Sequence, residues 1–140
     1  MHQIFFIGHP DDVAELEIDE NPASSFVCMS SQQFHRDART QLYALVTGGF
    51  VAEAFDLEIL DRELSEEGPY LYRLESNLMR QLAELEEDQV EEFANLWTEC
   101  QEIEALGLEV DDLLDFIFLL VHFCQTARND DLGVYIYSDN

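Results

Sequence analysis

Short runs rich in aromatic and β-branched residues stand near both ends of the chain. Gln3 to Ile7 (QIFFI) comes directly before Gly8, and Gly133 to Tyr137 (GVYIY) comes near the end of the sequence. Runs of this composition predict β-strands. Tyr70 to Leu74 predicts a third strand because its larger apolar residues alternate. Phe26 to Met29 predicts either a small strand or an extended lead-in to the next helix.

Between these runs, apolar residues recur at spacings of three and four, which predicts helices. We expect these helices over about 10–17, 32–46, 50–64, 76–85, 87–105 and 110–128. Ser30 or Ser31 is the expected N-cap of the second helix, and Ser76 that of the fourth. Gly48-Gly49, Gly68-Pro69 and Gly107 are the expected stops.

The last two predicted helices differ in pattern. Glu87 to Ala105 is strongly amphipathic, with acidic residues on one arc and residues such as Phe93, Trp97 and Cys100 on the other. Val110 to Arg128 is apolar on all sides, which predicts the buried centre of the domain. Terminal strands with helices between them predict an α+β fold: one domain over 1–140, mostly helical, with a small sheet of the N- and C-terminal strands and a central strand near 70–74.

The chain has 31 Asp and Glu residues against six basic residues, all arginine, which gives a formal net charge of -25. This charge disfavours direct binding to nucleic acid or to an anionic membrane, and it favours a basic protein as partner. Residues 81–127 contain 13 carboxylates and no Lys or Arg. We predict that a binding face, if one exists, consists of the acidic arc of the amphipathic helix: Glu87, Asp88, Glu91, Glu92, Glu99 and Glu102.

Residues 87–104 carry seven carboxylates in 18 positions. At the helical rise of about 1.5 Å per residue this is roughly one charge per 3.9 Å, against about 1.7 Å in duplex DNA. A second acidic face beside the first, such as Glu109 to Asp115, would bring the density near that of DNA, so mimicry of DNA is a hypothesis for a partner that binds nucleic acid. Two alternatives stay open: a surface that only aids solubility, and adaptation to a halophilic host.

Gly8-His9-Pro10-Asp11-Asp12 resembles the box of the PIG-L/LmbE-like N-acetylglucosaminyl deacetylases. The resemblance implies that His9 and Asp12 are zinc ligands and Asp11 the general base of a zinc-dependent hydrolase. It covers about five residues, and Val13 stands where the family has Glu. The alternative is an ordinary strand-to-helix turn with proline and acidic residues in its first turn.

The segment from Gly68 onward (GPYLYRLESNLMRQLAELEEDQVEEFANLWTECQEI), with the apolar helix and the VYIYS strand, is similar to the C-terminal half of the YfbM-like family of uncharacterised bacterial proteins. Phe34 to Gly48 (FHRDARTQLYALVTG) resembles a helix of the same family. The resemblance implies an α+β fold and supplies no catalytic residues. We therefore expect a non-enzymatic interaction or accessory role in the bacterial cytoplasm, with the zinc hydrolase as the alternative.

The remaining candidate residues predict no further chemistry. Cys28, Cys100 and Cys124 are widely spaced, which predicts free, buried thiols and no zinc site. His122 lies in the apolar helix, where a hydrogen-bonded core histidine is expected. No cofactor is expected, since the chain has no P-loop, GxGxxG or GxSxG motif. Residues 1–7 lack a signal-peptide pattern, and no apolar run reaches the length of about 20 residues that spans a bilayer.

Overall fold

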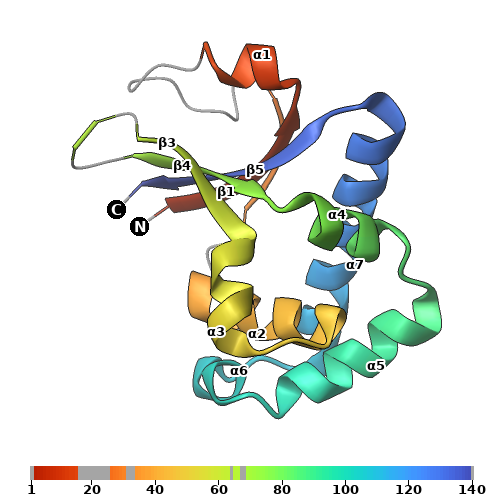
Figure 1. The fold of residues 1–140 in the computed structure, drawn as a ribbon. Helices are drawn as coiled ribbons and strands as arrows, with labels where there is room; N and C mark the ends of the chain where they lie inside the picture. The colour runs from red at the N-terminus through yellow and green to blue at the C-terminus, as the bar shows by residue number, and fades with distance from the viewer. Residues whose placement is uncertain (1, 16–25, 31–33, 64, 67–68, 140) are drawn as a thin grey trace.

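A computed structural model describes residues 2–15, 26–30, 34–63, 65–66 and 69–139. Its centre is a five-stranded antiparallel sheet with the strand order β2-β1-β5-β4-β3 (Figure 1). The strands are β1 (His2–Gly8), β2 (Val27–Ser30), β3 (Glu58–Glu63), β4 (Tyr70–Leu74) and β5 (Gly133–Asp139).

The sheet confirms the predicted pairing of the two ends of the chain. β1 runs antiparallel to β5 with Phe5 opposite Ile136, and β5 pairs on its other side with β4. Side chains alternate between the two faces of a strand. Phe5 therefore belongs to the large core beneath the sheet, whereas its neighbour Phe6 packs with Tyr135 on the opposite face, at a centroid distance of 5.6 Å.

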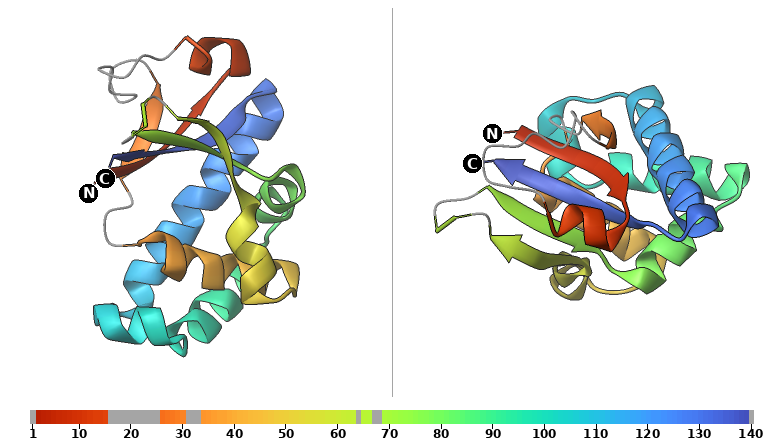
Figure 2. Two further views of the ribbon diagram at one scale, coloured as in Figure 1. Left: turned by 60° about the vertical axis from the view of Figure 1, so that its left-hand side comes forward. Right: turned by 90° about the horizontal axis from the view of Figure 1, so that it is seen from above.

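Of the described elements, six α-helices and one 3-10 turn lie on the helical side of the sheet, while α1 lies on the other side (Figures 1 and 2). The elements are α1 (Pro10–Val13), α2 (Arg36–Thr47), α3 (Val51–Ala54), η2 (Phe55–Leu57), α4 (Ser76–Ala83), α5 (Glu87–Thr98), α6 (Gln101–Leu106) and α7 (Val110–Asp130). The α+β, mostly helical architecture is the predicted one. Among the described residues, no helix has the length and apolar character needed to cross a membrane.

The predicted helix over 50–64 is wrong. The segment forms only one short α-helix turn and a 3-10 turn before it becomes strand β3, which pairs with β4 through Ile59 opposite Arg73. The register shifts between Leu60 and Arg62, as at a β-bulge. Pairing with a strand that lies later in the sequence outweighs the helical spacing of the apolar residues.

The predicted N-caps of α2 and α4 are also wrong. The α2 helix begins at Arg36, where the His35 side chain accepts a hydrogen bond from the Ala38 backbone N–H at 3.3 Å. In α4 the capping side chain is Glu75, which accepts from the Leu78 N–H at 2.9 Å. The end of α1 also differs from the prediction of about residue 17, since α1 ends at Val13 and residues 16–17 lie outside the described part.

The single amphipathic helix predicted over 87–105 is two helices in the structure. The backbone of Cys100 is extended, with φ -75° and ψ 141°, so that α5 ends at Thr98 and α6 starts at Gln101. Trp97, near this break, is fully buried and donates from its indole N–H to the Ala38 carbonyl at 2.9 Å. This bond anchors the end of α5 to α2, and the stacking of Trp97 on Phe34 anchors it to the segment just before α2.

The prediction that α7 is buried on all sides is wrong for one side of the helix. Leu113, Ile117 and Leu120 are fully buried, but Phe118 and Leu119 are 41% and 49% exposed. His122 is on this exposed side as well, so it is not the predicted core histidine. Phe116, on the buried side, stacks on Phe34 at a centroid distance of 4.3 Å.

Candidate functional site

The acidic residues of α5 lie on its solvent-facing side. Glu87, Asp88, Glu91 and Glu92 are all exposed, and Glu99 is exposed where the helix ends. Residues four apart are neighbours on a helix, so the pairs Glu87/Glu91 and Asp88/Glu92 repel each other. Five of the six predicted residues of the acidic arc are therefore in contact with solvent.

Glu102, the sixth residue of the predicted face, is different. It belongs to α6, is only half-exposed, and accepts a hydrogen bond from the Gln41 side-chain amide of α2. The break at Cys100 places it on a different helix from the other five. Glu102 therefore joins α6 to α2 as well as adding to the negative charge.

Part of the remaining charge has a local structural role. Glu86 forms a capping box with Gln89 at the start of α5, and Glu109 forms one with Asp112 at the start of α7. Carboxylates at these positions satisfy free backbone N–H groups and stabilise the positive end of the helix dipole. The need for helix caps thus accounts for some of the acidic residues, but not for those in the second turn of α5.

We use the name acidic surface for the exposed carboxylates of α5, α6 and the first turns of α7. In Figure 1 and in the left-hand view of Figure 2 these elements lie together at the end of the molecule remote from the sheet. Among the described residues no arginine forms an ion pair with any of these carboxylates; the arginine ion pairs found among the described residues are Arg36–Glu58 and Arg39–Glu58. The acidic surface consists of Glu87, Asp88, Glu91, Glu92, Glu99, Glu104, Asp111, Asp112 and Asp115, together with the half-exposed Glu102.

Four large apolar side chains are exposed on the same three helices. They are Leu96 on α5, Leu106 at the end of α6, and Phe118 and Leu119 on α7. On α7 the last two lie on one side of the helix with Asp115, one turn before them, and His122, one turn after. The three helices therefore carry both exposed carboxylates and exposed apolar side chains.

A buried ionic cluster links α2 to β3, and the sequence analysis did not find it. Arg39 and Glu58 are 1% and 2% exposed and form two hydrogen bonds, from Nε at 2.7 Å and from Nη2 at 2.8 Å. The Tyr43 hydroxyl donates to the same carboxylate at 2.6 Å. Arg39 and Tyr43 are one turn apart on the apolar side of α2. An arginine on an apolar helix face is rarely buried without an opposite charge, so this position indicates a buried acidic partner.

This cluster is sealed from solvent and holds the fold together. Burial raises the pKa of Tyr43 well above its ordinary value, and the negative charge of Glu58 acts in the same direction. Burial alone would lower the pKa of Arg39, but the hydrogen bond and charge of Glu58 outweigh it and raise the pKa. Both groups therefore stay protonated in the folded protein at neutral pH.

The His9-Pro10-Asp11-Asp12 segment forms a strand-to-helix turn. The His9 ring accepts a hydrogen bond from the Asp11 N–H at 3.2 Å, and the α1 helix begins at Pro10. His9, Asp11 and Asp12 are exposed. In the part of the chain that the structure describes, no group of three or more His, Cys, Asp or Glu side chains is arranged to hold a metal ion. The turn thus gives His9 and Asp12 no third zinc ligand there.

The three cysteines are free, as predicted, but only Cys124 is fully buried. Burial raises the pKa of Cys124 from 9.0 to about 12. Cys28 and Cys100 are half-exposed, and burial raises the pKa of each; at Cys100 the charges of Glu102 and Glu99 add to the effect. A raised pKa reduces the thiolate fraction, which is opposite to what a nucleophilic cysteine needs.

The fold and this surface define an acidic α+β protein with a charged, partly apolar helical end. No protein-family model, curated protein or solved structure matches the chain. The similarities to the YfbM-like family and to the deacetylase box therefore stay predictions from short sequence segments.

Proposed function

We propose that this protein is a non-enzymatic binding protein whose partner is a basic protein, and that the partner binds to the acidic surface. The observation that carries the proposal is the missing counter-charge: the exposed carboxylates of α5, α6 and early α7 have no arginine partner among the described residues. A surface of one sign attracts an oppositely charged protein over long range and raises its association rate.

The exposed apolar residues favour a protein partner over simple solvation. Leu96, Leu106, Phe118 and Leu119 add nothing to solubility, whereas the buried centre of a protein interface is enriched in aromatic and aliphatic side chains. Negative charge beside exposed apolar groups complements a basic amphipathic helix or a basic patch with an apolar centre.

The finer proposal is that the partner binds nucleic acid and that the acidic surface takes the place of the phosphates. Support comes from the first two turns of α5, where four exposed carboxylates follow one another closely, and from the acidic start of α7. A DNA duplex then competes with this protein for the partner.

The proposal is tested with two variants that lose the same number of charges. One carries Glu87→Gln, Glu91→Gln and Glu92→Gln on α5; the matched control carries Asp56→Asn, Glu63→Gln and Glu66→Gln, which are exposed on η2, β3 and the following turn. Proteins from the native host are captured on the wild-type chain, identified, purified and titrated against all three proteins by calorimetry.

We expect the α5 variant to bind the partner at least about tenfold more weakly at low salt, and the control variant to bind it as the wild type does. A partner that binds both variants equally well contradicts the proposal. Displacement of the partner by a DNA duplex supports the DNA-mimic form, and a partner that binds DNA and this protein together contradicts that form.

A further inference from the structure

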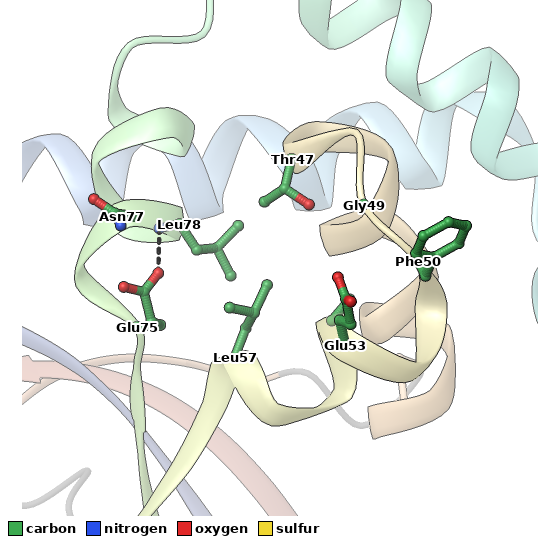
Figure 3. A pocket seen from close by; sticks show the side chains of 9 residues that line it. Thr47, Gly49, Phe50, Glu53, Leu57, Glu75, Asn77 and Leu78 are labelled. Atoms are coloured by element: carbon green, nitrogen blue, oxygen red, sulfur yellow. Dashed lines mark hydrogen bonds between the residues drawn. The ribbon is translucent and has the colours of Figure 1, made fainter.

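A cavity of about 370 Å³ lies between the end of α2, α3, η2 and the start of α4 (Figure 3). Its polar and aromatic residues have other roles or other directions. Glu75 accepts a hydrogen bond from the Leu78 N–H at 2.9 Å, and its other carboxylate oxygen points away from the cavity, as does the Phe50 ring (Figure 3). Glu53 is exposed to solvent. The cavity therefore offers no built ligand site, and the uncovered side of α7 is the more informative surface.

This side of α7 is a continuous stripe along the helix. α4, α5, β1 and β5 contact α7 on its other sides. The residues that remain uncovered recur at helical spacing, and all of them are exposed except the last, which is half-exposed. We use the name α7 stripe for these residues: Asp111, Asp115, Phe118, Leu119, His122 and Thr126.

The two halves of the α7 stripe differ in chemistry. Phe118 and Leu119, 41% and 49% exposed, form its apolar centre. The residues before this centre are carboxylates, which accept hydrogen bonds, and the residues after it are a histidine and a threonine, which can donate them. Asp115 and His122 are seven positions apart, which is about 10.5 Å along a helix, so the two halves of one copy do not meet.

A second copy of α7 brings the two halves together when it runs antiparallel to the first. With a two-fold axis at the apolar centre, Phe118 of one copy faces Leu119 of the other, and Asp115 faces His122. The next positions outward place each Asp111 opposite a Thr126 hydroxyl. Symmetry makes every contact occur twice, and antiparallel helix dipoles attract each other.

This complementarity favours a second copy over a basic helix as the occupant of the α7 stripe. A basic helix would pair with Asp111 and Asp115, but it would supply no acceptor to His122 and Thr126 in the other half. A second copy provides an acceptor for each donor and an apolar side chain for each apolar side chain. The α7 stripe is therefore complementary to itself, as the contact of a two-fold symmetric dimer must be.

The net charge of -25 opposes association of two copies at long range. Salt screens this repulsion, because the Debye length falls from about 30 Å at 0.01 M to about 3 Å at 1 M ionic strength. Hydrogen bonds and apolar contacts inside the interface are short-range and are screened much less. Association of two copies should therefore strengthen as salt rises, whereas binding of a basic partner should weaken.

We propose that the protein forms a symmetric dimer through an antiparallel pair of α7 helices, with the α7 stripe as the contact surface. Phe118 and Leu119 pack against each other across the two-fold axis. On each side of this centre, Asp115 accepts a hydrogen bond from His122 of the second copy.

The dimer goes beyond the proposed function and does not rest on it. The exposed carboxylates of α5 are not part of the α7 stripe, so each copy keeps them for a basic partner. Leu96 and Leu106 also lie outside the stripe and stay available to that partner.

The first test is sedimentation equilibrium of the full chain at neutral pH over a salt series. We expect a dimer with a Kd on the order of 10–100 µM at about 0.5 M NaCl, and association weaker by about tenfold or more at about 50 mM NaCl. Phe118→Ser should weaken the dimer by about tenfold or more. A chain that is monomeric at about 1 mM protein in 0.5 M NaCl, or association that does not strengthen with salt, overturns the proposal.

The second test checks which residues face each other. His122→Asp places a carboxylate opposite Asp115 at both ends of the contact and is expected to weaken the dimer by about tenfold or more. Adding Asp115→Lys to His122→Asp creates an opposite-charge pair at the same place and should restore the affinity to within about threefold of wild type. The matched control adds Glu91→Lys on α5 instead, which changes the net charge equally but lies outside the stripe.

We expect the Glu91→Lys control to leave the dimer of His122→Asp weak. If both additions restored the dimer equally, reduced general repulsion would explain the result and the assigned register would be wrong. If Asp115→Lys gave no restoration, the antiparallel pairing of Asp115 with His122 would be overturned. Circular dichroism of each variant verifies that the fold is kept.

The dimer and the proposed function fail in different ways. The variant with Glu87, Glu91 and Glu92 each changed to Gln is expected to lose the basic partner and to keep the dimer. A chain that is monomeric but loses its partner on this change contradicts the dimer alone. A dimeric chain whose partner still binds this variant contradicts the proposed function alone.

Discussion

At the scale of single residues, the cluster of Arg39, Tyr43 and Glu58 connects α2 to the sheet. Its polar groups are almost completely removed from water, so each depends on the others for its hydrogen bonds and counter-charge. Arg39 also donates to the Phe34 carbonyl at 2.6 Å, directly before α2 begins. Removing Glu58 or Arg39 takes away the opposite charge that compensates the other.

We predict that Glu58→Gln lowers the free energy of unfolding by about 3–5 kcal/mol, because it removes the carboxylate charge that compensates the buried Arg39 guanidinium. The double variant Arg39→Met with Glu58→Gln is expected to lose less than the sum of the two single losses. Urea denaturation followed by circular dichroism measures all three. Arg80→Met, an exposed arginine on α4, serves as control and should stay within about 0.5 kcal/mol. If the double variant lost the sum of the two single losses, Arg39 and Glu58 would not be energetically coupled.

Cys124 gives a pH prediction at the same scale. Its thiol has a pKa of about 12 in the folded protein, against 9.0 for a thiol in water, so the unfolded chain loses this proton first as pH rises. Below pH 9 the thiol is protonated in both states, and the free energy of unfolding keeps its full value. Above pH 9 the free energy of unfolding declines by about 1.4 kcal/mol per pH unit until the folded pKa is reached. Denaturation of the wild type between pH 8 and pH 10.5, as approximate end points, should therefore show a steeper loss of stability than that of Cys124→Ala. If the free energy of unfolding fell equally with pH in the wild type and in Cys124→Ala, the raised pKa of Cys124 would be refuted.

At the scale of elements, the helices are delimited by a few backbone positions. The α2 helix ends at Gly48, whose φ of 71° is left-handed, and α6 ends at Gly107 with φ 68°. Left-handed backbone is available to glycine without the steric cost that a Cβ brings. The ends of both helices are therefore determined by residues that also stand out in the sequence.

Two adjacent glycines allow a matched test of this explanation. Gly48→Ala is expected to lower the free energy of unfolding by about 1 kcal/mol, because alanine must adopt a left-handed backbone although there is open space for its Cβ. At Gly49 the nearest atom to an added Cβ is the Thr47 hydroxyl oxygen at 3.4 Å, an ordinary contact. Gly49→Ala should leave stability unchanged or raise it by about 0.4 kcal/mol. Thermal denaturation of both variants checks the difference, and equal effects would contradict it.

At the scale of the whole molecule, the net charge of -25 acts on stability as well as on binding. Exposed carboxylates on α5, α6 and early α7 repel one another with no arginine between them among the described residues. Such repulsion destabilises the compact state and is screened by salt. The charge that attracts a basic partner therefore has a cost in stability.

We predict that the protein unfolds cooperatively even at about 20 mM NaCl, and that about 0.5 M NaCl raises its Tm by roughly 3–5 °C. The variant with Glu87, Glu91 and Glu92 each changed to Gln should show a smaller rise, because the screened repulsion is already reduced. Differential scanning calorimetry over a salt series makes the measurement. A chain that folds only in molar salt would instead support adaptation to a halophilic host.

The sequence by itself determined the features that local patterns control. The strands at both ends and at 70–74, the amphipathic character of α5 and the helix stops at Gly48 and Gly107 follow from local sequence patterns within one segment, so no knowledge of the fold is needed. The predicted stop at Gly68-Pro69 belonged to the helix over 50–64 that does not form, and Gly68 lies outside the described residues. The exposure of Glu87, Asp88, Glu91 and Glu92 follows in the same way, since one helix face must bury Val90, Ala94 and Trp97.

Only the tertiary structure decided the features that depend on contacts between distant residues. Strand β3 exists because it pairs with β4, and Glu58 is buried because Arg39, 19 positions earlier, supplies its partner. The break at Cys100 accompanies the anchoring of Trp97 to α2, and the exposed side of α7 is the side that no other described helix covers. The spacing of apolar residues indicates which secondary structure a segment prefers by itself. The pairing of β3, the burial of Glu58 and the break at Cys100 depend instead on the free energy of packing one segment against another.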